Sequence, residues 1–364
     1  MGKTVNYGVI GCGMMGQEHL RNIGLLPDAR VAAIFEPDQA MAHAAKQFAG
    51  GATLCNSLDQ LLDMADLDCL LVVSPNHLHV DQFEQIANRR PLPLLIEKPL
   101  YTTPGDASRV DFLQASYPAP VWVAMEYRYM PPIAAFLNET DAATGGVTML
   151  SIREHRYPFL HKVSNWNRFN RYSGGTLVEK CCHFFDLMRL ILRSEPVRVM
   201  ASGGQDVNHK GESYDGEAPD IWDAAFVIVD FANGKRAMLE LCMYAEGSRY
   251  QEEISAVGPS GRIEAKVPGP TRFWNAEIGP PPVARVILSP RFPTGPREVE
   301  IPVDPTLLEV GDHNGSTFYQ HRRFLDVVRG IASPEVTLHD GAMAVKMGLA
   351  AQASAATGRA VDIG

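Results

Sequence analysis

The chain has 364 residues, of which 46% are hydrophobic and 21% charged, a balance typical of a globular protein with room for two cores. Its formal net charge of -9 argues against nucleic acid or an anionic membrane as the main partner, because both are bound through positive fields. The sequence shows no signal segment and no apolar run of about 18 residues, so we expect a cytoplasmic protein. The six cysteines form no Cys-x-x-Cys pair, so we expect neither a disulfide framework nor a metal site.

The stretch from Val5 to Gly16 predicts a buried strand, a tight glycine turn and the start of a helix. Its glycines fit the dinucleotide-binding fingerprint Gly-x-Gly-x-x-Gly, at Gly11, Gly13 and Gly16. In that fingerprint the first glycine makes the turn, the second admits a pyrophosphate, and the third lets the helix pack on the strand. The alternative is a glycine-rich turn that serves only helix packing.

A second strand, Arg30 to Phe35, ends at Glu36, where the ribose-binding acid of a dinucleotide site is expected. A carboxylate there would accept hydrogen bonds from the ribose hydroxyls and would repel a 2′-phosphate. Pro37 and Asp38 offer no arginine to receive such a phosphate. The sequence therefore favours NAD over NADP.

Strand-like and helix-like segments alternate through the first 125 or so residues. The further strands are expected at Ala52 to Cys55, Cys69 to Val73, Leu94 to Ile96 and Val121 to Met125. This alternation predicts an α/β fold with a doubly wound parallel sheet, whose ligands lie at the carboxyl ends of the strands. We place this dinucleotide-binding Rossmann domain at residues 1–126.

After Tyr127 the pattern changes to strands that follow one another closely, with a hairpin signal at Asn233-Gly234. The strands are expected at Val147 to Arg153, Val197 to Ala201, Ala225 to Phe231, Arg236 to Cys242, Ile254 to Val257 and Arg262 to Lys266. Residues 127–364 are thus predicted to form an α+β domain with an open, mainly antiparallel sheet, for substrate binding and oligomerisation. Ten prolines mark residues 268–305 as an arm or hairpin insertion. Two helices should close the chain, one capped by Ser316 and one, Thr337 to Thr357, stopped by Gly358.

A helix opened by Gly174-Gly175 carries Glu179, His183 and Asp186 at spacings of four and three, which places them on one stripe. His183 could act as an acid or base oriented by Glu179, or be a core histidine satisfied by its neighbours. Lys98 lies at the mouth of a sheet strand and precedes a proline. It could stabilise a developing alkoxide, or be a solvated lysine paired with Glu97.

Cations and aromatic residues gather just before this helix. They are Arg153, His155, Arg156, His161, Lys162, Arg168 and Arg171, interleaved with Tyr157, Trp166 and Tyr172. Such a cluster suits a sugar bearing an anionic group; the alternative is a solvated strand face with oligomer contacts. Residues around the start of a later helix could reach the same substrate site, namely His313, Tyr319, Gln320 and His321.

Several motifs together resemble the glucose-fructose oxidoreductase, inositol dehydrogenase and rhizopine-catabolism (Gfo/Idh/MocA) family. Besides the glycine turn and the helix with His183, they are Pro75-Asn76-x-x-His79, Glu97-Lys98-Pro99 and Glu126-x-Arg128-x-x-Pro131. The resemblance spans most of the chain, and Glu-Lys-Pro is its most specific part. It implies a Rossmann domain, an open mixed sheet, an NAD or NADP cofactor, and sugar or polyol substrates.

By matching positions, the resemblance implies that Lys98 and His183 are catalytic, with Glu179 where the family usually has aspartate. It implies cofactor contacts from the loop Gly11, Cys12, Gly13, Met14, Met15 and Gly16, and from Glu36, Ser74, Pro75, Asn76, His79, Glu97, Lys98, Glu126 and Arg128. The candidate substrate-binding residues are Lys98, Arg153, Arg156, Trp166, Arg168, Glu179, His183, His313 and Tyr319. The family's Asp-x-Gly-x-His is Glu-Lys-Cys-Cys-His here, which leaves open which group takes the proton.

These features predict an NAD-dependent oxidoreductase that acts on a secondary hydroxyl of a sugar, sugar derivative or polyol, possibly an anionic one. Two alternative functions would use the same cofactor site and the same candidate residues. One is an NAD-dependent glycosidase that works by transient oxidation and elimination, and the other is a sugar-sensing regulator without turnover. The resemblance also implies a homodimer or homotetramer.

Overall fold

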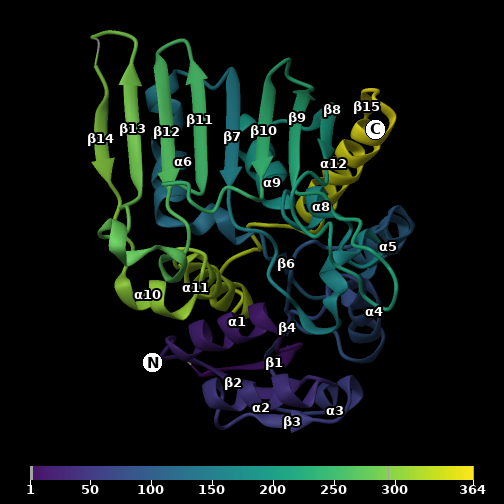
Figure 1. The fold of residues 1–364 in the computed structure, drawn as a ribbon. Coiled ribbons are helices and arrows are strands. Elements are labelled where there is room, and N and C mark those ends of the chain that lie inside the picture. The colour runs from purple at the N-terminus through teal and green to yellow at the C-terminus, as the bar shows by residue number, and fades with distance from the viewer. Residues whose placement is uncertain (1–2, 294, 364) are drawn as a thin grey trace.

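The computed structural model describes residues 3–293 and 295–363. It contains two sheets, a six-stranded one formed by the first third of the chain and a nine-stranded one formed by the rest (Figure 1). None of the helices in these two ranges is both long and apolar enough to cross a membrane.

The first sheet is wholly parallel, with the order β3-β2-β1-β4-β5-β6. Its strands are β1 (Val5–Ile10), β2 (Ala29–Phe35), β3 (Thr53–Cys55), β4 (Cys69–Val72), β5 (Leu94–Ile96) and β6 (Val121–Val123). The connecting helices are α1 (Met14–Gly24), α2 (Gln39–Phe48), α3 (Leu58–Leu62), α4 (His79–Arg89) and α5 (Ala107–Ser116). The strand order reverses between β1 and β4, which confirms the doubly wound sheet and places its ligand crevice at their carboxyl ends.

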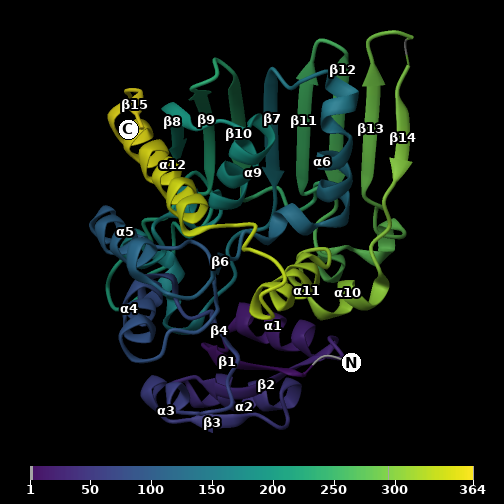
Figure 2. The same cartoon turned by 180° about the vertical axis from the view of Figure 1, so that it is seen from behind.

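The second sheet has the order β14-β13-β12-β11-β7-β10-β9-β8-β15, and its neighbours pair antiparallel except for β7 with β10. Its strands are β7 (Met149–His155), β8 (Pro196–Gly204), β9 (Ala224–Phe231), β10 (Arg236–Cys242), β11 (Glu252–Gly258), β12 (Gly261–Val267), β13 (Arg285–Pro290), β14 (Arg297–Glu300) and β15 (Val361–Asp362). The accompanying helices are α6 (Pro131–Thr144), α7 (Asn170–Ser173), α8 (Thr176–Glu179), α9 (Cys182–Leu192), α10 (Pro305–Val310), α11 (Ser316–Val328) and α12 (Leu338–Thr357). Helices α6, α9 and α12 lie on one face of this sheet (Figure 2), and the opposite face is open.

Two turn predictions are confirmed. Strands β9 and β10 form the hairpin signalled by Asn233-Gly234, with Gly234 at a φ of +78°. In the proline-rich segment, β13 pairs with β12 and β14 with β13, so the insertion is a hairpin that lengthens the edge of the sheet. Its prolines lie mostly outside these strands, because proline cannot donate to a strand ladder.

The ends of the two last helices differ in how well the sequence predicted them. Thr337 caps α12 with a reciprocal hydrogen bond to Asp340, and Gly358 ends it in the left-handed conformation, as expected. Ser316 was expected to cap α11, and this is wrong: it is the first residue inside the helix, after a left-handed Gly315. Helix α11 packs against α1 and α12 against α5, so the end of the chain returns to the first sheet.

The predicted single helix after Gly175 is wrong, because the structure has two short helices with a break at Lys180 and Cys181. At the break, the backbone N–H of Cys181 bonds to the carbonyl oxygen of Thr176, so the regular helical bond to the carbonyl oxygen of Leu177 is not formed. A side chain at Gly348 would bring its Cβ within 2.5 Å of the carbonyl oxygen of Leu177. The break turns Glu179 and His183 toward different partners.

Candidate active site

The glycine turn has the geometry that the fingerprint requires. A Cβ at Gly11, whose φ is +94°, would lie 2.7 Å from backbone atoms of Ser74, and a Cβ at Gly16 would lie 2.7 Å from the carbonyl oxygen of Gly11. A Cβ at Gly13 would meet no atom within 4 Å among the described residues. The first and third glycines are therefore required by packing, whereas the second borders open space, as the approach of a pyrophosphate requires.

Glu36 lies beside this turn. Its carboxylate accepts hydrogen bonds from the backbone N–H groups of Cys12 at 2.6 Å and Asp38 at 2.9 Å. Each oxygen of the carboxylate thus accepts one backbone bond and keeps a lone pair for another donor. The residues present fit a dinucleotide whose ribose hydroxyls reach Glu36.

The loop after β4 is held together by its own polar groups. Ser74 donates to Gln82 at 2.6 Å, and the Asn76 amide donates to the carbonyl oxygen of Ser173 at 3.2 Å. The ring of His79 is buried between the carbonyl oxygens of Ser74 and Pro99. These contacts fix the ends of β4 and β5 next to the glycine turn.

Lys98 follows β5 and reaches across to the second half of the chain. Its Nζ donates to the backbone oxygen of Glu179 at 3.3 Å. Burial alone would lower the pKa of Lys98, but Cys182 and the carboxylates of Glu97, Glu126 and Glu179 raise it. The side chain is therefore an ammonium at neutral pH.

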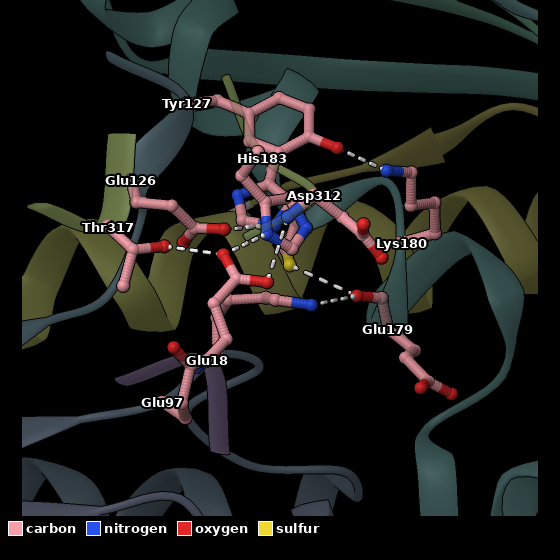
Figure 3. A network of polar contacts seen from close by, with 12 residues as sticks. Glu18, Glu97, Glu126, Tyr127, Glu179, Lys180, His183, Asp312 and Thr317 are labelled. Carbon is pink, nitrogen blue, oxygen red and sulfur yellow. Dashed lines mark hydrogen bonds and ion pairs between the residues drawn. The ribbon is translucent and has the colours of Figure 1, made fainter. Parts of the chain in front are cut away.

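His183 lies in α9, only 1% exposed, with its ring stacked on Tyr127 at 4.0 Å between centroids and 7° between planes. Its Nε2 lies 3.7 Å from Oε1 of Glu126, and its Nδ1 has no hydrogen-bond partner in the described structure (Figure 3). Burial and the charge of Lys98 lower the pKa of His183 well below its usual value. The imidazole is therefore neutral at pH 7 and able to accept a proton.

Glu179 does not contact His183 through any hydrogen bond in the structure. Its Oε1 accepts from Lys162 at 2.9 Å, and the ammonium of Lys162 lies 4.4 Å from the centre of the Trp166 ring. The other oxygen, Oε2, is buried and lacks a partner among residues 3–293 and 295–363. Asp186 is also occupied elsewhere, in a bidentate ion pair with Arg128 at 2.5 and 2.6 Å.

Two ion pairs flank Tyr127, one buried and one half-buried. Lys180 lies 2.8 Å from Glu154, and it also donates to the Tyr127 hydroxyl. On the other side, His313 donates to Glu18 at 2.9 Å. Although burial alone would lower the pKa of His313, Glu18 raises it to about 9, so His313 is a cation at neutral pH.

A chain of buried side chains ends at Glu97. Its links are Tyr7 to His321 at 3.4 Å, His321 to His19 at 2.8 Å and His19 to Glu97 at 2.9 Å. Each of these three hydrogen bonds has one donor and one acceptor when both imidazoles are neutral and each side chain donates to the next one toward Glu97. The positions of these protons are assigned from the hydrogen-bond network. Glu97 also accepts from the backbone N–H of Lys98, so the chain helps to hold the segment that carries Lys98.

The sequence alone did not indicate that Glu18, His19, Tyr127, Glu154 and Lys180 belong to this site. Two of these residues could have been inferred from the sequence. Tyr127 lies between Glu126 and Arg128 of a family motif, and His19 lies three positions after Gly16 on the same helix. The others are recruited by tertiary packing.

The cationic cluster is mostly neutralised by nearby acids. Arg153 pairs with Glu253 and His155 with Glu240, both on the open face of the sheet. The remaining pairs are Arg156 with Glu154, Arg168 with Glu212, and Arg171 with Glu217. The structure thus brings Lys162 and Arg156 toward Glu179 and Lys180, and leaves Arg153 on the far side of the sheet.

Other candidates are placed as follows. His313 lies 6.0 Å from Tyr127 between ring centres, within the same cluster as His183. Tyr319 packs on Phe318. Met14 is 41% exposed beside the glycine turn, whereas Cys12 is fully buried.

The doubly wound sheet and the glycine turn with Glu36 define a class, the dinucleotide-binding proteins. The profile for the oxidoreductase family's NAD-binding Rossmann fold matches residues 5–125, and that for its C-terminal alpha/beta domain matches residues 144–363. The chain therefore belongs to the Gfo/Idh/MocA oxidoreductase family, and its cofactor is NAD.

Known proteins of this family are similar over most of the chain. Inositol 2-dehydrogenase 2 of Saccharopolyspora erythraea is 30% identical over 296 residues, 79% of this chain and 81% of its own. Inositol 2-dehydrogenase of Rhizobium meliloti is 29% identical over 269 residues, 72% of this chain and 76% of its own. The structure of a myo-inositol dehydrogenase from Lactobacillus casei with NAD(H) and myo-inositol superimposes with a TM-score of 0.74 at 21% identity, covering 99% of this chain and 97% of its own.

Proposed function

We propose that this protein transfers hydride between NAD and a secondary hydroxyl of a sugar, sugar derivative or polyol, with cyclic polyols related to inositol as the first candidates. The observation that carries this proposal is the convergence of Lys98 and His183, from different halves of the chain. Lys98 bonds to the backbone of Glu179, four residues before His183, and is the charge that most lowers the pKa of His183. The names of two relatives, both inositol 2-dehydrogenases, support the substrate class.

NAD, when bound, accepts the hydride from the substrate carbon. The Lys98 ammonium binds the hydroxyl oxygen and stabilises the negative charge that develops there. His183, neutral before the reaction, removes the hydroxyl proton. We assign the unpartnered oxygen of Glu179 to a second substrate hydroxyl, which would orient the ring of the substrate.

The cofactor would lie along the first sheet. We assign its pyrophosphate to the turn from Gly11 to Gly16, its adenosine ribose to Glu36, and its nicotinamide side to residues 74–76 and Glu97. These assignments agree with a domain boundary at residue 126, after which the chain crosses to the second sheet.

We favour a neutral substrate over an anionic one. The arginines that the sequence suggested as ligands for an anionic substrate are paired with glutamates. One of them, Arg153, also lies on the open face of the second sheet. The cation nearest to Glu179, Lys162, is bonded to that carboxylate. An anionic group would have to break one of these pairs.

A substrate panel tests the proposal. The protein is incubated with NAD or NADP and with inositols, neutral and anionic sugars, and aryl glycosides, while NADH formation and aglycone release are followed. We expect NADH from at least one polyol or sugar, with NAD preferred over NADP by more than about tenfold, a difference of about 1.4 kcal/mol. Aglycone release without NADH would contradict the proposal in favour of a glycosidase. Tight binding of one sugar without turnover would contradict it in favour of a sensor.

We propose further that the open face of the second sheet is covered by another copy of the chain, in a homodimer or homotetramer. This face exposes apolar side chains on four adjacent strands, namely Met149, Phe226, Ile228, Met238 and Val257. Contiguous apolar surface of this kind typically marks an interface. Light scattering should give at least twice the mass of one chain, and Phe226→Glu should lower it; a wild-type monomer would contradict the proposal.

We also propose a cytoplasmic location. All six cysteines are free thiols, and five of them are buried. Free thiols are typical of a reducing compartment. Recovery of the protein in the cytosolic fraction would test this.

A further inference from the structure

We infer that Glu126 takes up the substrate proton from His183, which makes His183 a relay and Glu126 the group on which the proton rests. The inference rests on the proposed function and assigns Glu126 a role other than the cofactor contact that the family resemblance implies. It is carried by the geometry around His183, shown in Figure 3.

Glu126 is a buried carboxyl without a hydrogen-bond partner. It lies three residues after the end of β6, is 1% exposed, and neither of its oxygens forms a hydrogen bond within the described parts of the chain. Such a group is costly to keep, so it calls for an explanation. The side chain points toward His183, and Oε1 lies 3.7 Å from the ring Nε2 (Figure 3). Catalytic contacts of this length commonly shorten to a hydrogen bond when the substrate is bound.

The charged neighbours of Glu126 are already engaged. They are Glu97 and Lys98 after β5 and His313 before α11, whereas Cys182 and His183 on α9 are neutral neighbours. Glu97 bonds to His19, Lys98 to the backbone of Glu179, and His313 to Glu18. Among the three carboxylates that act on Lys98, namely Glu97, Glu126 and Glu179, Glu126 is thus the one with both oxygens open to a proton donor, as far as residues 3–293 and 295–363 extend.

His183 cannot hold the proton for long. An imidazolium there would be buried beside Lys98, Lys180 and the charged His313, all of which lower its pKa. Glu126 has the opposite property: burial and the charge of Glu97 raise its pKa to about 7. Its carboxylate can therefore gain and lose a proton near neutral pH, which suits a general base.

The proton transfers balance as follows. The substrate O–H gives its proton to Nδ1 of His183, and Nε2–H of the same ring gives its proton to Oε1 of Glu126. The electron pair of the substrate C–H bond leaves as hydride to NAD, the oxidant, and the substrate becomes a ketone. His183 is neutral before and after, with its tautomer exchanged, and Glu126 becomes protonated. The assignment of the two nitrogens follows from the position of Nε2 beside the carboxylate.

Glu126→Gln tests the inference, because it keeps the size of the side chain and removes the proton acceptor. In the wild type, kcat for oxidation should rise with pH through about 7, since the ionised carboxylate is the form that accepts the proton. In the variant, kcat should fall by about 10²-fold, and the rise of kcat with pH near pH 7, the limb of the pH profile, should disappear. KM and the affinity for NAD should stay within about twofold, and Glu126→Asp should restore part of the rate together with the limb.

The matched control is Glu252→Gln. Glu252 is also fully buried, and burial with the charge of Glu154 raises its pKa to about 7, but it accepts from Gln251 rather than facing His183. This variant should keep the limb near pH 7. Infrared difference titration of the cofactor-free protein gives a second readout, in which each variant should lose one carboxyl band that titrates near pH 7.

Three results would overturn the inference. One is wild-type kcat with an unchanged pH profile in Glu126→Gln, and another is an infrared titration that Glu126→Gln leaves unaltered. Either of these, in an active enzyme, would leave the proposed function standing. The third, a wild-type protein that turns over nothing in the substrate panel, would overturn the proposed function and this inference together.

Discussion

Lys98→Met should lower kcat for polyol oxidation by about 10²- to 10³-fold, the range seen when one donor to a developing oxyanion is removed. Methionine fills a similar volume but carries no charge, so the alkoxide would develop without its cation. The loss should appear in kcat more than in the affinity for NAD, because we assign the pyrophosphate and the adenosine ribose to the glycine turn and Glu36 rather than to Lys98. Stopped-flow measurement of NADH formation, with NAD affinity from fluorescence, would separate the two effects.

Lys235→Met is the matched control for this experiment. Lys235 follows Gly234 in the β9–β10 hairpin, outside the candidate site, and its replacement should leave turnover and NAD affinity unchanged. Near-normal turnover in Lys98→Met, with the control also active, would contradict the role of Lys98.

His183→Ala should lower kcat by about 10²- to 10⁴-fold, the usual contribution of a positioned acid or base. The change also removes the ring that stacks on Tyr127, so thermal unfolding should be measured beside activity. Added imidazole should restore part of the turnover, since it can occupy the space left by the ring and accept a proton. A variant that stays folded and turns over at the wild-type rate would contradict the assignment.

The exposed His43 of α2 supplies the control, because His43→Ala should change neither turnover nor its response to imidazole. A double variant adds information about the relay. If Glu126 acts through His183, His183→Ala combined with Glu126→Gln should be no slower than His183→Ala alone.

Local signals predicted the first half of the fold well. The glycine spacing and the apolar strand from Cys69 each depend on a few neighbouring residues, and the structure confirms both. The single helix predicted after Gly175 is wrong, and next to its interruption the carbonyl oxygen of Leu177 lies close to Gly348, a residue far away in the sequence. No local pattern can report a backbone approach of that kind.

The candidate site divides in the same way. Lys98 and His183 stand in recognisable motifs, so the sequence could nominate both. Their partners could not be predicted, because the neighbours of a buried charge come from several elements. Glu179, expected beside His183, bonds to Lys162, while Glu126 occupies the place beside the imidazole.

The order of residues by itself determined the doubly wound sheet, the dinucleotide turn, the NAD preference and the two candidate catalytic groups, because each rests on spacing or chemistry within a short segment. The tertiary structure alone decided which carboxylate faces His183, which arginines are neutralised, and that α11 returns to α1. These depend on contacts between residues up to about 300 positions apart, such as His19 with His321, and only the packed chain brings such residues together.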